Sequence, residues 1–482
     1  MINGTMIQYF EWALPKGMLW KKLTDEAGRL SEDGFTAVWI PPAYKGAWGE
    51  DDIGYSPYDL YDLGEFDQRG GVPTRYGTKE ELAAAIRAVQ SRNMQVYADI
   101  VFDHMMGADA TETVEAREVN PENRYENEGG YREIAAWTNF KFPGRNRKYS
   151  DFEWHWNNFT GIDQDANTGK KGIYRFRGKN WQKDVDKENG NFDYLMGANI
   201  DLNDVEVQNE LVRWGKWFLD QTGVDGFRMD AVKHMETVFL DEWLEKMREY
   251  TGRELFTVGE YWHGDYGALK YYVDQTSGAM SLFDAPLHFR FQDAANYGEN
   301  FDLRGIFAKT LTKDNPMKSV TFVDNHDTQP GQSLSSWVDD WFKPIAYALI
   351  LLRKEGYPCV FYGDYYGIEK DGIAPKRDML LPLLRTRSKY AYGAQNDYFD
   401  QPGLVGWTRE GDEVHENSGV AVVISNDKPG RKKMYLNKKY VGAWFYDITG
   451  NTRNTVRIAE DGTGRFPVEE RSVSVYVRVG NK

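Results

Sequence analysis

The sequence predicts an α/β protein built on a (β/α)8 TIM barrel, with an irregular β-rich domain inserted after the third strand and an antiparallel β-sandwich domain at the C-terminus. Short apolar runs of strand type alternate with amphipathic helical segments, a pattern typical of a parallel sheet. Polar side chains gather at the C-terminal ends of several of these runs, where a (β/α)8 barrel carries its polar groups. A doubly wound sheet also collects polar groups at strand ends and is the alternative arrangement.

Eight runs are strand candidates, and the helical signal between them is clearest after the second. In 78–93, Thr78 and Glu81 have the spacing of a capping box that starts a helix. Apolar residues then recur on one helical face at Leu82, Ile86 and Val89. The strand candidates are 5–10, 35–42, 95–104, 223–231, 254–262, 279–286, 319–327 and 357–364.

Two stretches break the alternation and set the domain boundaries. Residues 105–204 are too long for a plain connection, so we expect them to form the inserted β-rich domain. In 396–482 the helical period disappears and short strands alternate with turn residues, which predicts an all-β domain. The barrel then comprises 1–104 and 205–395.

Composition points to a large globular protein with a neutral partner. Of the 482 residues, 41% are hydrophobic, enough to bury a sizeable core. The formal net charge of -15 opposes approach to nucleic acid or to an acidic membrane surface. The chain has 16 Trp and 30 Tyr, more than a core needs, and such flat amphipathic rings suit the faces of sugars. The single cysteine, Cys359, lies in an apolar run and is expected to be a buried structural thiol.

The sequence also predicts where in the cell the protein is found. No basic-then-apolar leader follows Met1, and no apolar run is long enough to cross a bilayer. We therefore expect a cytoplasmic protein with no membrane partner, unless a leader was removed before the given sequence begins.

Three acids at the ends of strand candidates are the candidate catalytic groups: Asp230, Glu260 and Asp327. Each one singly is more simply interpreted as a structural carboxylate. Together, beside His104 and His326, they form the kind of titratable cluster that marks a functional site. Cleavage of a glycosidic bond needs such a group, with a protonated carboxyl to donate to the leaving oxygen and an ionised carboxylate to attack.

The segment GFRMDAVKH (226–234) places a base beside one of these acids. On a strand, side chains alternate between faces, so Arg228 and Asp230 share one side. A guanidinium there favours the ionised form of Asp230, while crowding of acids raises the pKa of at least one of them. We therefore expect one base and one acid.

Five motifs resemble those of the α-amylase family of glycoside hydrolases, specifically its liquefying-type bacterial members. They occur in the family's order and spacing, and the likeness covers essentially the whole chain. The resemblance implies retention of anomeric configuration, action on α-1,4-glucosidic bonds and a monomeric protein. The motifs are DIVFDH (99–104), ANIDLND (198–204), GFRMDAVKH (226–234), VGEYW (258–262) and FVDNHD (322–327).

The resemblance implies a role for each acid. Asp230 becomes the nucleophile that forms a glycosyl-enzyme intermediate, Glu260 the general acid/base, and Asp327 the carboxylate that distorts the sugar and stabilises the transition state. Arg228 orients Asp230 and keeps it ionised. For Trp12 and Trp48, a place in the core or the cleft wall is as expected as a sugar contact. The other residues implied to contact the substrate are Tyr55, His104, Lys233, His234, Trp262 and His326.

The resemblance also implies one structural Ca²⁺ between the inserted domain and the barrel. Its ligands would be Asp103, Asp193, Asn199 and the carbonyl of His234, oxygen donors that suit a hard cation. Asp103 stands where these relatives usually have Asn, and Asn199 where they usually have Asp, so the exchange keeps the total ligand charge. The alternative is that Asp103 and Asp193 make interdomain hydrogen bonds without a metal.

A second metal feature of the family is expected to be absent. Thr160, Gln182 and Asn203 stand where the heat-stable members carry the acids of a calcium-sodium-calcium cluster. Loss of three carboxylates removes most of the charge that such a site needs.

Three functions remain open. The leading hypothesis is an endo-acting retaining α-1,4-glucan hydrolase, an α-amylase that cleaves starch, glycogen or maltooligosaccharides. A transglycosylating or exo-acting maltogenic relative is the second, because the same acids serve water and sugar acceptors. The third is a catalytically silent glucan-binding protein, since a fold alone does not establish function; the three intact acids argue against it.

Overall fold

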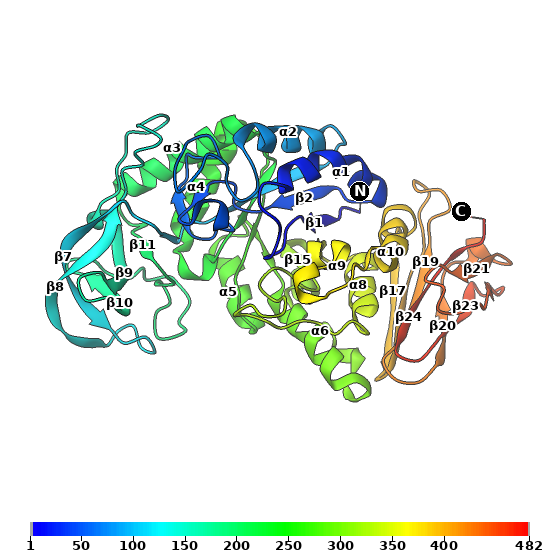
Figure 1. Ribbon diagram of the computed structural model, residues 1–482. Coiled ribbons are helices and arrows are strands. Elements are labelled where there is room, and N and C mark those ends of the chain that lie inside the picture. The colour runs from blue at the N-terminus through cyan, green and yellow to red at the C-terminus, as the bar shows by residue number, and fades with distance from the viewer. Residues whose placement is uncertain (1–2, 481–482) are drawn as a thin grey trace.

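A computed structural model describes residues 3–480, with a barrel in the middle, a β-rich domain on one side and a second β domain on the other (Figure 1). The barrel is closed by eight parallel strands in the order β1-β16-β15-β14-β13-β12-β5-β2. Closure excludes the doubly wound alternative, and each strand lies within one of the eight predicted runs. The strands are β1 (Met6–Gln8), β2 (Ala37–Ile40), β5 (Gln95–Ile100), β12 (Gly226–Met229), β13 (Phe256–Gly259), β14 (Ser281–Phe283), β15 (Ser319–Phe322) and β16 (Tyr357–Phe361).

Helices surround the barrel. The helix with the clearest sequence signal, α2, begins where the sequence predicts. The Thr78 hydroxyl accepts a hydrogen bond from the Glu81 amide, and the Glu81 carboxylate accepts one from the Thr78 amide. The predicted apolar face of α2 is buried. The helices are α1 (Leu19–Asp33), α2 (Lys79–Gln90), α3 (Val205–Thr222), α4 (Thr237–Thr251), α5 (Tyr266–Gln275), α6 (Ala285–Tyr297), α7 (Leu311–Asp314), α8 (Lys343–Leu352), α9 (Tyr362–Tyr366) and α10 (Arg377–Lys389).

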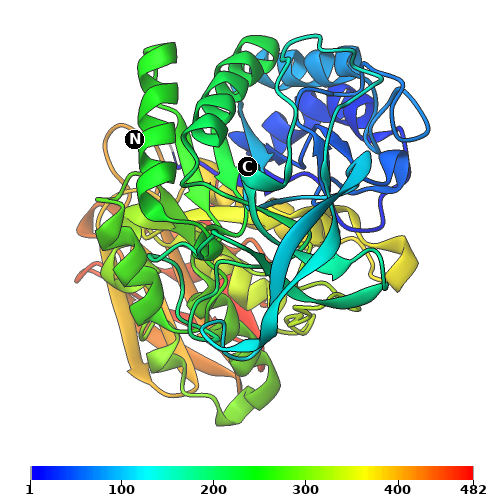
Figure 2. The same ribbon diagram turned by 90° about the vertical axis from the view of Figure 1, so that its left-hand side faces the viewer.

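The segment between β5 and α3 forms a six-stranded antiparallel sheet in the order β6-β11-β9-β10-β7-β8. Figure 2 looks onto this domain and shows the long β7–β8 hairpin lying in front of the barrel. β5 ends at Ile100 and β6 begins at His104, where it pairs with β11, so the sheet starts close to the rim of the barrel. The strands are β6 (His104–Met105), β7 (Ala110–Val119), β8 (Asn127–Asn139), β9 (Phe159–Asp165), β10 (Lys170–Phe176) and β11 (Ala198–Ile200).

The C-terminal region is an antiparallel β-sandwich, as predicted. A six-stranded sheet (β17-β18-β19-β24-β21-β22) packs against the β20–β23 pair, and the apolar cluster between them draws on both, with Val423 and Tyr476 from one and Met434 and Phe466 from the other. The strands are β17 (Gln395–Gln401), β18 (Leu404–Arg409), β19 (Val420–Ser425), β20 (Gly430–Tyr435), β21 (Trp444–Asp447), β22 (Val456–Arg457), β23 (Thr463–Val468) and β24 (Ser472–Arg478).

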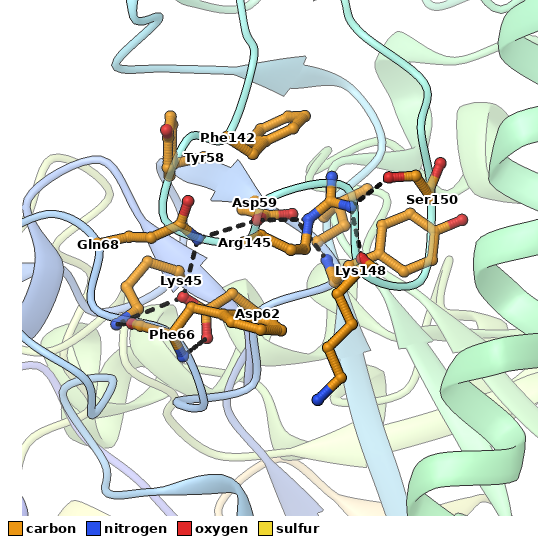
Figure 3. A network of polar contacts seen from close by, with 12 residues as sticks. Lys45, Tyr58, Asp59, Asp62, Phe66, Gln68, Phe142, Arg145, Lys148 and Ser150 are labelled. Atoms are coloured by element: carbon orange, nitrogen blue, oxygen red, sulfur yellow. Dashed lines mark hydrogen bonds and ion pairs between the residues drawn. The ribbon is translucent and has the colours of Figure 1, made fainter.

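A buried polar network joins the loop after β2 to the inserted domain (Figure 3). The loop contains the short strands β3 (Lys45–Gly46) and β4 (Pro57–Asp59). The Lys45 ammonium donates to the carbonyls of Gly71 (2.8 Å) and Val72 (2.7 Å). The Gln68 amide donates to Asp59 and Asp62 at 3.0 Å each, and Arg145 of the inserted domain donates to Asp59 at 2.9 Å. The network fixes a loop that also carries Tyr55.

The structure also bears on two further predictions, one about Cys359 and one about membrane-spanning helices. Cys359 lies in β16 and is a buried free thiol, as expected. From residue 3 to residue 480, no helix combines the length and the apolar character needed to cross a membrane.

Candidate active site

The three predicted acids line one cavity at the C-terminal ends of the barrel strands. Asp230 follows β12, Glu260 follows β13, and Asp327 lies in the loop after β15. The cavity has a volume of about 610 Å³ and all three acids are among its lining residues. Parallel strands that end at the same rim therefore bring together residues that are far apart in the sequence.

Arg228 lies beneath these acids, fully buried, and connects two of them. Its Nη1 donates to Asp230 and to Asp99. The distance from Nη1 to Asp99 Oδ1 is 2.9 Å. Its Nη2 lies 3.2 Å from Glu260 Oε2. Burial opposes the guanidinium charge, but Asp99, Glu260 and Asp230 outweigh it and raise the pKa of Arg228 well above its usual value. Arg228 is therefore a permanent cation at the base of the site.

Glu260 has the environment of a proton donor. Burial raises its pKa to about 7; Arg228 opposes this shift and Asp230 adds to it. The Ala231 amide donates to Glu260 Oε2 at 3.2 Å and fixes the carboxyl. The pKa of Asp327 is raised well above its usual value by burial and by Glu260. Near neutral pH, Glu260 is thus present in both the protonated and the ionised form, as an acid that later serves as a base requires.

Backbone hydrogen bonds link the chain at Asp230 to the chain at Glu260 and fix the relative position of the two residues. The Glu260 amide donates to the carbonyl of Met229 at 2.9 Å, and the Val232 amide donates to the carbonyl of Glu260 at 3.0 Å. Between them Ala231 has φ of 50°, in the left-handed region. Such a conformation costs about 1–3 kcal/mol in a residue with a side chain and concentrates at functional sites.

A stack of flat rings forms one wall of the cavity. The rings of Tyr55 and His326 lie 5.0 Å apart and nearly parallel, at 12°. Trp12 is nearly parallel to both rings, with centroids 6.2 Å from Tyr55 and 5.9 Å from His326. All three line the cavity, so Trp12 belongs to the cleft wall. Trp48 is not among the lining residues and is 64% exposed.

The two predicted histidines of this wall are held differently. The Gln8 amide lies 2.9 Å from His326 Nδ1, and His326 Nε2 lies 3.3 Å from Asp327. Burial and then Arg228 hold the pKa of His326 well below its usual value, so the ring is neutral. His104 has protein partners at both nitrogens, the Asp103 carboxylate at 3.0 Å and the Tyr55 carbonyl at 2.9 Å. It lines the cavity, and its contact with sugar stays a prediction.

The remaining predicted substrate residues line the cavity on the side of Glu260: Lys233, His234 and Trp262. Lys233 forms an ion pair of 3.0 Å with Glu188 of the inserted domain. The His234 Nδ1 donates to the carbonyl of Phe192 at 2.6 Å. Burial, aided by Lys233, lowers the pKa of His234 to about 3, so its ring is neutral as well.

One residue of the site was missed in the sequence. Asp99, fully buried on β5, accepts hydrogen bonds from Arg228, from the indole of Trp39 at 3.0 Å and from the phenol of Tyr55 at 2.7 Å. It therefore orients both the guanidinium and a ring of the cavity wall. An acid within an otherwise apolar strand was the signal, because a buried carboxylate needs several partners.

Three of the four expected metal ligands lie close together: Asp103, Asp193 and Asn199. Asn199 Nδ2 donates to Asp193 at 3.2 Å and to the Thr160 hydroxyl at 2.8 Å. The Gln182 amide donates to Asp193. Asp103 and Asp193 are both buried, and the pKa of Asp193 is raised well above its usual value by burial and then by Asp103.

The donor set fits a hard cation. Over the described chain, Asp193 has no cationic side chain within ion-pair distance, and the buried Asn199 Oδ1 has no hydrogen-bond partner. His234 lies beside them through its bond to Phe192, the residue before Asp193. Carboxylate and amide oxygens of this kind are what Ca²⁺ binds, although Asp193 also makes the hydrogen bonds expected without a metal.

The fold and the cavity together define a class of protein. A closed (β/α)8 barrel with several acids at its C-terminal rim, one of them poised to donate a proton near neutral pH, is the arrangement of hydrolases that cleave glycosidic bonds. Models of known families identify the particular member of this class. The model of the alpha amylase catalytic domain matches residues 20–445, and that of the alpha-amylase C-terminal domain matches residues 420–477. The chain belongs to the alpha-amylase family of glycoside hydrolases.

Individual relatives agree with this assignment over almost the whole chain. An alpha-amylase of Geobacillus stearothermophilus is 54% identical, over 98% of this chain and 87% of the relative. A cytoplasmic alpha-amylase of Escherichia coli (strain K12) is 41% identical, over 99% of each chain. The structure of an alpha-amylase from Geobacillus thermoleovorans complexed with acarbose has a TM-score of 0.65 at 18% identity, covering 100% of this chain and 98% of the other, which shows a shared fold.

Proposed function

We propose that this glycoside hydrolase is an endo-acting, retaining α-1,4-glucan hydrolase that cleaves starch, glycogen or maltooligosaccharides through a covalent glycosyl-enzyme intermediate. The proposal is supported mainly by one observation. The guanidinium of Arg228 contacts both Asp230 and Glu260, and the pKa of Glu260 is raised to about 7. Sharing one guanidinium keeps the two carboxyls close, which favours retention, for which a separation of about 5–5.5 Å is typical.

The steps follow from these environments. The Asp230 carboxylate attacks the anomeric carbon while the glycosidic carbon-oxygen bond breaks and the Glu260 proton passes to the leaving oxygen. Glu260, now ionised, takes a proton from water, and that water attacks the same carbon and releases Asp230. Asp327, whose pKa is raised well above its usual value by burial and by Glu260, lines the cavity within reach of a bound sugar's hydroxyls. Tyr55 offers a ring face to the C-H groups of a pyranose.

The decisive experiment compares two signals from one starch digest. The purified protein is given soluble starch, and loss of iodine staining is plotted against new reducing ends, with Glu260→Gln as the control. Internal cuts remove the stain rapidly with few new ends, and Glu260→Gln does neither. Slow stain loss with many new ends would replace the endo-acting proposal by an exo-acting one, and no change in either would indicate a glucan-binding protein without activity.

We also propose that one structural Ca²⁺ is held by Asp103, Asp193, Asn199 and the His234 carbonyl. Two buried carboxylates and the unpartnered Asn199 Oδ1 support the proposal. When bound, the ion would neutralise the buried charge where the inserted sheet meets the barrel. It takes no part in the chemical steps above, which use residues of the barrel rim.

We infer further that the protein acts in the cytoplasm. The support is the likeness, along the full length of both chains, to a relative named as a cytoplasmic enzyme. Fractionation of the source cells tests the inference: activity and protein in the soluble cell extract support it, and their recovery in the culture medium contradicts it.

A further inference from the structure

A buried cluster of charged groups lies behind the loop that carries Asp327 and has no part in the steps described above. At its centre the Lys343 ammonium, at the start of α8, donates to Asp324 and to Asp364 at 2.6 Å each. The Tyr347 phenol donates to the other oxygen of Asp364, also at 2.6 Å. These four residues are buried and do not line the catalytic cavity. The cluster can therefore affect the reaction only through other residues.

The cation of this cluster is held from several sides. Removing a charge from water is costly, so a buried charge persists only where close partners offset the lost hydration. Burial opposes the charge of Lys343, but Asp324 and Asp364 outweigh it and raise the Lys343 pKa. The ammonium also lies 3.3 Å from the centroid of the Trp337 ring. Lys343 is thus a fixed cation against which the Asp324 carboxylate is held.

Asp324 connects this cation to the loop after β15. Its Oδ2 accepts a hydrogen bond from Lys343, and its Oδ1 accepts one from the Thr328 hydroxyl at 2.8 Å. The Thr328 hydroxyl oxygen in turn accepts one from the Asn325 amide at 2.9 Å. The side-chain oxygen of Asn325 accepts from the amides of Asp327 and Thr328, at 2.9 Å each. Residues 324–328 therefore form a turn whose own side chains fix the backbone of Asp327.

The position of the Asp327 carboxylate depends on this turn. Asp327 lines the cavity, and its carboxylate lies 3.3 Å from Nε2 of His326, the residue directly before it. A shift of the turn would move both side chains relative to Asp230 and Glu260, which follow other strands. Because a misplacement of about 1 Å can cost about a hundredfold in rate, a residue that fixes the turn affects catalysis without touching the sugar.

We propose that Thr328 and Asp324 are positioning residues of the reaction, which hold the turn against the buried Lys343 cation and so place the Asp327 carboxylate at the cleaved bond. The inference rests on the proposed glucan hydrolysis and adds the residues that set the geometry of its third acid. Their effect belongs in kcat and not in KM, because Asp327 is expected to contact the sugar most strongly in the transition state.

The test compares the steady-state kinetics of isosteric variants on a maltooligosaccharide, with circular dichroism as the check of folding. Thr328→Val keeps the shape of the side chain but removes the hydroxyl between Asp324 and the Asn325 amide, whereas Thr328→Ser keeps the hydroxyl. Thr312→Val is the matched control, since Thr312 is also buried and also donates to a buried acid, Asp284, at 2.6 Å. Neither residue of the control pair lines the cavity.

In Thr328→Val we expect kcat to fall about 10- to 100-fold with KM within about twofold of the parent, while Thr328→Ser and Thr312→Val keep kcat within about threefold. A second measurement adds Thr328→Val to Asp327→Asn. There the further loss should be less than about twofold, because the carboxylate that the turn positions is already gone. A general loss of stability would instead lower kcat by the same factor in both backgrounds.

An unchanged kcat in Thr328→Val, or an equal loss in Thr312→Val, overturns the inference. So does a loss that is as large in the Asp327→Asn background as in the parent. Should Asp327→Asn be too slow to follow, the loss in Thr328→Val and its recovery in Thr328→Ser decide. Should Thr328→Val not fold, Asp324→Asn, which removes the charge that faces Lys343, is measured in its place with the same expectation. A parent protein that cleaves no maltooligosaccharide would refute the proposed function itself, which is a separate outcome.

Discussion

At the scale of residues, the central feature of the site is the buried guanidinium of Arg228, which contacts three acids. Arg228 contacts Asp99, Asp230 and Glu260, all of them on or directly after neighbouring strands of the barrel. Asp230 and Glu260 face the cavity, whereas Asp99 lies beneath it. The same cation that contacts the Asp230 carboxylate opposes, without cancelling, the upward shift of the Glu260 pKa.

The pKa of Glu260 predicts the alkaline limit of activity. The free enzyme needs Glu260 protonated for the first step, and its pKa is about 7. We expect kcat/KM to fall as pH rises through about 7, tenfold per unit well above it. Glu260→Gln, which has no proton to lose, should remove this limb along with about 10²–10⁴-fold of the rate. A parent profile that stays flat from pH 6 to 9 would contradict the assignment of Glu260 as the acid.

The residue that the sequence did not reveal gives a second prediction. Arg228 donates to Asp99 Oδ1, whereas Trp39 and Tyr55 both donate to Oδ2, so Asp99→Asn removes the charge and leaves one acceptor oxygen in place of two. Because a hydrogen bond to a charged group contributes about 1.5–3 kcal/mol, kcat should fall about 10- to 100-fold.

Asp225→Asn is the control for that change. Asp225 lies directly before β12, at the opposite end of the barrel from the site, and accepts hydrogen bonds from Gln90 and from the Val96 amide. Steady-state kinetics on a maltooligosaccharide should leave its kcat near the parent value. Equal losses in the two variants would mean that Asp99 acts on the fold and not on the site.

At the scale of elements, the loop after β2 depends on buried ion pairs for its shape. Arg145 donates to Asp59 and, at 2.7 and 2.6 Å, to the carbonyls of Lys148 and Ser150 (Figure 3). Arg145→Met leaves Asp59 buried without a cation, and we expect the free energy of unfolding to fall by about 3–5 kcal/mol.

An exposed pair a few residues away provides the comparison. Arg147, whose side chain is 70% exposed, contacts Glu153 at 3.0 Å, and Arg147→Met should cost only about 0–1 kcal/mol. Urea unfolding followed by tryptophan fluorescence measures both variants. A loss in Arg147→Met as large as that in Arg145→Met would show that burial does not determine the difference.

The elements also show what the sequence could and could not reveal. All eight barrel strands were predictable because each is a short apolar run, and α2 because Thr78 and Glu81 cap it. The three rim acids were predictable for the same reason, since each lies at the C-terminal end of such a run. The partners of Asp99 were not, because Trp39 lies on β2 and Arg228 on β12, which only barrel closure places beside β5. The sequence of residues 105–204 predicted a β-rich domain. It did not predict which strands pair, because the order of strands in a sheet depends on contacts between segments far apart in the chain.

At the scale of the whole molecule, the proposed calcium ion lies where two parts of the structure meet. It would bind the folded chain and not the unfolded one, so it should stabilise the protein by about 2.7 kcal/mol at a hundredfold excess over its Kd. We expect a chelator to lower Tm and added Ca²⁺ to restore it, as measured by calorimetry. Asp193→Asn should remove most of this response, and a parent Tm that is the same with and without chelator would contradict the site.

The cavity lies between the barrel rim and the inserted domain, and we propose that Asp230 attacks the sugar there while Glu260 donates the proton. The most direct test is the anomeric form of the first product. Proton NMR of a maltooligosaccharide digest, read before mutarotation, should show the α-anomer at the newly formed reducing end, because two displacements at one carbon restore its configuration. An initial β-anomer would mean a single displacement by water and would contradict the nucleophilic role of Asp230.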